Sequence, residues 1–178
     1  MKKFLIFCFM FFMMSLSVYA ENIHFNDLIY KLKSVDNDKS KIENEYYIDG
    51  ENDNLWSSKV EITYYPELSN PLKYASEIDK KVSSDAKQLL LKFVQNKKLD
   101  IAVISYLENE IVADCACIIY NVLKYEKHPD KGIMGLKFSK KYRVNTNDDI
   151  QKIAVEYIKN KHLNIDKFNK VAKELKTI

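Results

Sequence analysis

The chain has 178 residues, with 28 lysines and arginines against 25 aspartates and glutamates, and Arg143 is its single arginine. This near balance of charge argues against binding to nucleic acid or to an anionic membrane by bulk attraction, and bidentate recognition of phosphate or guanine favours arginine. Twelve tyrosines, nine phenylalanines and only three glycines and three prolines are typical of a folded chain.

The first twenty residues have the pattern of a cleaved secretory signal peptide. Lys2 and Lys3 form a short positive start, residues 4–14 are continuously apolar, and the segment ends on Ala20 after small or aliphatic residues. The apolar run is shorter than the about 20 residues that a membrane-spanning helix needs. We therefore expect cleavage after Ala20, no stable membrane anchor, and a periplasmic or secreted bacterial protein. Without Lys2 and Lys3 the count is 28 − 2 = 26 basic against 25 acidic residues, a net charge of about +1.

Residues 21–44 are predicted to form a short helix followed by a linker. The helix rests on apolar spacings of three and four, at Ile23, Phe25, Leu28, Ile29 and Leu32. The polar stretch 33–45 is read as a loop, and residues 45–54 as a short strand followed by a turn at Asp49-Gly50.

The middle of the chain gives sharper signals. "WSSKVEITYYP" alternates with period two and predicts a strand that Pro66 ends. Asn70 as N-cap and Pro71 at the first helical position then predict a helix of three to four turns.

Four further strands are predicted within 86–96, 99–109, 112–128 and 131–144, joined by tight turns and therefore antiparallel. A last helix is expected from near Thr146, with a second helical piece around 165–175. Residues 45–178 thus form a single α+β domain, in which helices pack on one hairpin-connected antiparallel sheet of five to six strands.

The order of these elements resembles a known group of proteins. A Trp-led strand closed by Pro ("WSSKVEITYYP"), the helix "NPLKYASEI", the meander and its "KYEKHPDKGIMGLKFSKKYR" hairpin are similar to small secreted PsbP-like α/β/α proteins of unknown function. The resemblance covers about residues 45–160, and its motifs are structural, with no catalytic residue to carry over. It implies a protein-binding or accessory role.

Motifs for catalysis, cofactors and metals are missing from the sequence. His24, His128 and His162 fall in different elements without ligand spacing, and three glycines cannot build a phosphate-binding or dinucleotide loop. We therefore expect no catalytic residue, no cofactor and no metal ligand.

Two groups of residues remain as candidate sites. Tyr64 and Tyr65 must point to opposite faces of one strand, so an aromatic ring is expected outside the core; Tyr65, Tyr106 and the hairpin residue His128 form a candidate partner-binding surface. Cys115 and Cys117 share one face of a strand and form a candidate redox pair. Their Cα atoms should lie about 6.5 to 7 Å apart, at the upper limit for a disulfide, so two buried free thiols are the favoured interpretation.

These observations favour an exported, non-catalytic binding or accessory protein that engages a protein partner, with an inhibitor or immunity protein as a specific version. The alternatives are a thiol-based redox protein that uses the C-x-C pair, or a carrier of a small apolar ligand held between the sheet and its helices.

Overall fold

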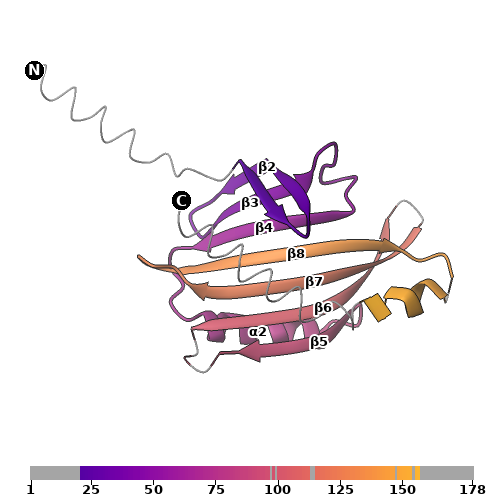
Figure 1. Cartoon of the computed structure of the whole chain (residues 1–178). Coiled ribbons are helices and arrows are strands. Elements are labelled where there is room, and N and C mark those ends of the chain that lie inside the picture. Colours follow the sequence, from indigo (N-terminus) through magenta and orange to yellow (C-terminus); the bar gives the residue numbers. More distant parts are fainter. Residues whose placement is uncertain are drawn as a thin grey trace, which may run out of the picture.

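The computed structural model describes residues 21–96, 98, 100–112, 115–146, 148–153 and 155–156. They form one eight-stranded antiparallel sheet with the strand order β1-β2-β3-β4-β8-β7-β6-β5 (Figure 1). The strands are β1 (Asn22–Phe25), β2 (Leu28–Asn37), β3 (Ile42–Ile48), β4 (Ser58–Tyr65), β5 (Gln88–Gln95), β6 (Ile101–Val112), β7 (Cys115–Lys127) and β8 (Ile133–Arg143), and the helix α2 (Pro71–Ser84) lies between β4 and β5.

The predicted fold class is wrong. The described part of the chain is mostly sheet, with eight strands and only two short helices, instead of an α+β fold with five to six strands. The difference arises mainly in residues 21–44, which were predicted as helix and linker and form β1, β2 and the start of β3. Asn26 and Asp27 have φ angles of 53° and 62°, so they make a two-residue hairpin turn of the kind that favours these residue types.

Two four-stranded meanders build the sheet. Strands β1 to β4 follow one another, strands β5 to β8 do the same, and the last strand of each meander pairs with the other, with Tyr65 opposite Ile133 and Ser58 opposite Lys140. The link between the meanders is a crossover: α2 carries the chain from the central β4 to β5 at the far edge.

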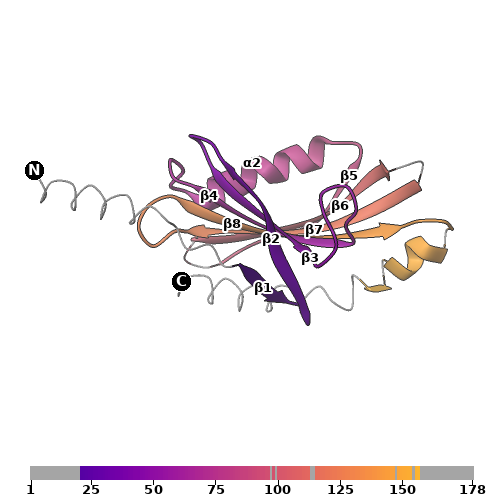
Figure 2. The same cartoon turned by 90° about the horizontal axis from the view of Figure 1, so that it is seen from above.

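The predicted helix begins as expected. The side chain of Asn70 accepts a hydrogen bond from the backbone N–H of Lys73 at 3.0 Å, and Pro71 occupies the first turn, where a missing N–H costs nothing. α2 packs on β5, β6 and β7, and lies behind the sheet in Figure 1 and on one side of it in Figure 2.

Each face of the sheet has its own apolar core. The core beneath α2 contains Ala75 and Val82 from the helix and buried residues of β6, β7 and β8: Ala102, Ile104, Tyr106, Leu123, Tyr125 and Ile133. On the other face β1 folds over the sheet (Figure 2), and the ring of Phe25 packs on Phe138 with centroids 4.8 Å apart.

The expected C-terminal helix is described in part. Residues 148–153 and 155–156 are helical, and the Asp149 carboxylate accepts hydrogen bonds from the backbone N–H groups of Asn145 and Thr146 at 2.9 and 3.0 Å. The expected signal peptide, residues 1–20, and the second helical piece near 165–175 lie outside the described residues. Among the helices that are described, none is long and apolar enough to cross a membrane.

Candidate functional site

The face of the sheet that carries α2 is covered by the helix over β5 to β7, and a charged strip follows on β3, β4 and β8. Alternate residues of β4 point to this face, so Lys59, Glu61 and Thr63 stand beside the glutamates of β3 and the lysines of β8. Glu45 and Glu61 are direct cross-strand neighbours. Two like charges in that relation are destabilising unless cations are close.

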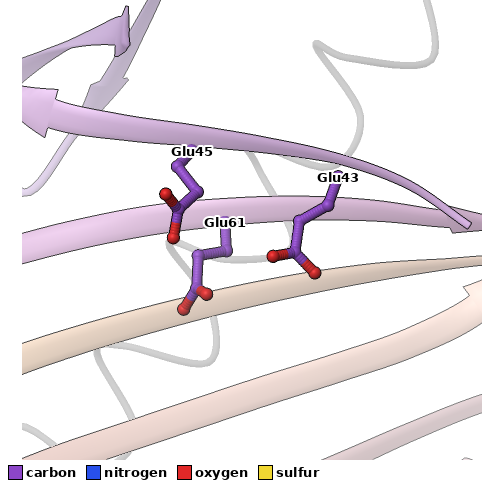
Figure 3. A group of neighbouring side chains, drawn as sticks. All are labelled: Glu43, Glu45 and Glu61. Atoms are coloured by element: carbon purple, nitrogen blue, oxygen red, sulfur yellow. The ribbon is translucent and has the colours of Figure 1, made fainter. Parts of the chain in front are cut away.

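Three glutamates gather at the centre of the charged strip, Glu43, Glu45 and Glu61, each with a carboxylate oxygen within 4.8 Å of the others (Figure 3). Lysines surround them. Lys41 lies 2.8 Å from Glu43, Lys59 lies 3.0 Å from Glu45, and Lys137 lies 2.8 Å from Glu61. Because each carboxylate already has an ammonium partner, the cluster is an ion-pair network, and a metal ion would have to displace those lysines.

Glu61 is the most buried member, with 9% of its surface exposed. Burial by itself would raise the pKa of Glu61, but Lys137 and Lys59 together outweigh burial and hold the pKa below its ordinary value. Burial likewise opposes the charge on Lys59, yet Glu61 and Glu45 raise the pKa of its ammonium. Both groups therefore stay ionised at neutral pH.

Aromatic rings border the outer end of the strip. The ammonium of Lys141 lies 4.1 Å from the ring centroid of Trp56, and that of Lys59 lies 5.5 Å from Trp56 and 5.8 Å from Tyr47. Burial is the main cause that raises the pKa of Tyr47 to about 12. Trp56 precedes β4 and turns towards its lysine-bearing face, although strict alternation back from Val60 would put it on the opposite face.

A cavity of about 230 Å³ lies between α2 and the inner end of the strip. Its floor includes Glu61, Lys137 and Gly135, and the helix contributes Ile78 and Lys81 to its wall. The remaining lining residues are Glu43, Thr63, Tyr65, Tyr74, Val82, Gln88, Tyr106, Leu123, Tyr125 and Leu136.

Four tyrosines line this cavity: Tyr65, Tyr74, Tyr106 and Tyr125. Tyr74 of α2 packs between Tyr65 and Tyr125, with ring centroids 5.0 and 5.1 Å away. Burial is the largest cause that raises the pKa of Tyr65, Tyr106 and Tyr125 above the ordinary value, so these phenols stay protonated and can donate hydrogen bonds.

The structure brings two of the three candidate surface residues together. Tyr65 of β4 and Tyr106 of β6 both line the cavity, and Tyr106 is only 8% exposed. His128 does not line the cavity: it lies in the β7–β8 turn, where its ring packs on Tyr64 with centroids 4.9 Å apart. His24 is an exposed residue of β1, and His162 lies outside the described residues.

Cys115 and Cys117 lie on β7 as free thiols. Cys117 is buried at 4% exposure, and Cys115 is half-buried. Neither of them lines the cavity.

The charged members of the site were not singled out from the sequence. Glu61 and Lys59 stand at alternate positions inside the strand pattern 56–66, which marks the face opposite to Val60 as polar, but nothing local indicates the lysines and glutamates that lie beside them. Glu43 comes from a segment predicted as a loop, and Lys137 is brought next to β4 only by the pairing of β8.

The fold and the site define an antiparallel sheet protein with a polar cavity beneath a crossover helix. A family model of uncharacterised proteins matches residues 18–173, and the chain belongs to this family. No curated protein and no solved structure matches the chain.

Proposed function

We propose that the protein is an exported, non-catalytic binding protein that holds a protein partner against the charged strip and the cavity beside α2. The observation that carries the proposal is the juxtaposition of this cavity with the strip. A small pocket with hydrogen-bonding groups adjoins a surface of aromatic rings and charged side chains, and buried anchors surrounded by polar contacts are typical of protein interfaces.

The size of the cavity supports a protein partner over a free ligand. Ligand pockets usually enclose about 300 Å³ or more, whereas this one encloses about 230 Å³. Carboxylates, ammonium groups and phenols in its lining also disfavour a small apolar ligand. The redox alternative gains no support from Cys117, because a buried thiol is poorly placed for exchange with a substrate.

The strip also bears on the kind of partner. Lysines and glutamates alternate in it, so it presents neither a strongly acidic nor a strongly basic patch. An inhibitor or immunity protein with this surface would recognise its target by matched individual charges and by Trp56.

Site-specific photo-crosslinking tests the proposal. A photoreactive phenylalanine replaces Trp56 in the full chain, and a matched variant carries the same group at the exposed residue Lys98, in the β5–β6 turn at the edge of the sheet that is remote from the strip. We expect one discrete adduct with the same protein in repeated preparations at position 56 and none at position 98.

The partner identified in this way is then purified and its affinity measured directly. We expect Lys141→Glu, at the edge of the strip, to weaken binding at least about tenfold. Adducts of equal yield at both positions, or unchanged affinity of the purified pair after Lys141→Glu, would contradict the proposal.

A further inference from the structure

We propose that the cavity beneath α2 is a receptor for a single organic carboxylate group. This inference rests on the proposed function and gives it a chemistry: the partner would be anchored by a carboxylate, from an Asp or Glu side chain or from a chain terminus.

One lysine of the cavity lining has no acidic partner among the described residues. Glu43, Glu45 and Glu61 are matched by Lys41, Lys59 and Lys137, and these six groups sum to zero. Lys81 also lines the cavity, and among the residues that the structure describes it has no ion-pair partner. Lys81 is therefore the cation of the lining that is available to pair with an anionic occupant.

Two phenols supply directional donors. Tyr125 and Tyr106 are 5% and 8% exposed and line the cavity, and neither hydroxyl is hydrogen-bonded to another described residue. Two phenols that line one cavity and have no partner among the described residues can donate hydrogen bonds to a bound acceptor. A carboxylate offers two acceptor oxygens and gains more from each bond than a neutral acceptor does.

The rest of the cavity fits the carbon atoms that would carry the carboxylate. Ile78 and Val82 of α2 face Leu123 of the sheet, which gives an apolar wall beside the polar floor. The volume of about 230 Å³ accommodates one ring or one short chain. A rigid aromatic acid thus matches both halves of the cavity.

Benzoate and its neutral isostere benzamide are the probes for the full chain. Side-chain NMR signals of Tyr106 and Tyr125 are followed during titration at constant ionic strength. We expect saturable shifts with benzoate and binding of benzamide at least about tenfold weaker, because the charge-assisted contacts are lost. Lys81→Gln should weaken benzoate about tenfold, whereas Lys80→Gln, one residue away and not in the lining, should leave it unchanged.

A further variant, Tyr125→Phe, protects the test against loss of folding. Tyr125→Phe keeps the ring that packs on Tyr74 and removes only the hydroxyl, and circular dichroism verifies that it is folded. Equal affinity for benzoate and benzamide, absence of saturable shifts, or benzoate binding that is untouched by both Lys81→Gln and Tyr125→Phe would overturn the inference.

The benzoate titration and the crosslinking at Trp56 can fail independently of each other. If the Trp56 adduct forms and benzoate does not bind, the partner surface stands and the carboxylate receptor fails; if benzoate binds and no adduct forms, the reverse holds. To distinguish the sources of the carboxylate, the purified partner is tested with its C-terminus amidated and with its acidic side chains at the interface replaced by amides. If neither change weakens binding while free benzoate still binds, the cavity takes a small free acid.

Discussion

Tyr125 and Gly135 stand opposite each other on β7 and β8, and a Cβ atom on Gly135 would lie 3.0 Å from the ring of Tyr125. The missing side chain lets this ring lie against the strand, so that Gly135 forms part of the cavity floor. Tyr65 reaches the same position from β4, with its ring 3.6 Å from that Cβ. Gly135 therefore sets the shape of the cavity.

Substitution of the glycines by alanine should give a definite order of destabilisation. Gly135→Ala pushes on a ring that can shift by a few tenths of an ångström, so we expect a loss of about 1 kcal/mol. Gly132→Ala should cost about 3 kcal/mol, because Gly132 has φ +88° and its Cβ would collide with the backbone carbonyl of Tyr65. Gly50→Ala is the control for backbone strain alone, with φ +85° and open space around it. Urea denaturation measures all three, and equal losses would contradict this assignment.

The ion-pair network should make stability depend on pH. The folded pKa of Glu61 lies below its ordinary value of 4.5, so its contribution is complete above that pH and is lost as the pH falls through the lower folded pKa. We expect Glu61→Gln to cost about 2 kcal/mol at pH 7, since it leaves Lys59 and Lys137 without this carboxylate. Its denaturation midpoints should also fall less steeply than those of the parent protein below pH 4.5. Parallel curves would show that Glu61 is not held in its charged form by folding.

Cys115 and Cys117 should differ in reactivity. Iodoacetamide should label the half-buried Cys115 in the native protein at least about tenfold faster than the buried Cys117, since alkylation needs an exposed thiolate. After unfolding without reductant, mass spectrometry should find both thiols labelled, as is expected for free cysteines at positions i and i+2 of a strand. If Cys115 and Cys117 are labelled only after reduction, they form a disulfide, and that result would support the redox alternative.

The cap of α2 offers a test of a local sequence signal. Asn70→Ala removes the acceptor for the Lys73 N–H and should lower stability by about 1 kcal/mol, while Asn70→Ser should be nearly neutral because serine caps equally well. Thermal denaturation of the two variants distinguishes the cap from a general effect of substitution. An equal loss for serine and alanine would contradict the capping role.

The β1–β2 hairpin can be tested through its contact with the far meander. Phe25→Ala removes the ring that packs on Phe138 and should destabilise the protein by about 3 kcal/mol. Hydrogen exchange should increase in β1 and β2 more than in β6. Unchanged exchange in β1 and β2 would mean that this hairpin is held by other contacts.

The elements from Trp56 onward could be predicted because their signals are local. β4 shows plain alternation, Asn70-Pro71 marks the start of α2, and the later strands are separated by short turns. The N-terminal hairpin was missed because a two-residue turn resets the phase of the alternation. Ile23 and Phe25 share a face with Tyr30 and Leu32, and the intervening Leu28 and Ile29 completed a helix-like spacing.

The site could not be derived in the same way, since its parts come from six strands and α2. Tyr106 was selected for its residue type, and the structure gives it a place that the sequence did not indicate, in the lining of a cavity with Lys81 and Glu61. Their proximity depends on the pairing of β4 with β8, which joins residues far apart in the chain. The hydrophobic periodicity of a segment does not indicate which distant strand it pairs with.

The junction between β4 and β8 also bears on how the chain reaches its folded state. Every other strand pairing joins consecutive strands, so each meander can form from local contacts, and closing this junction is the step with the largest loss of chain entropy. At high concentration the same junction can close between two chains, with α2 and its flanking turns as the hinge. Exchange of whole meanders between two chains, which gives a domain-swapped dimer, is therefore the misassembly that this topology favours.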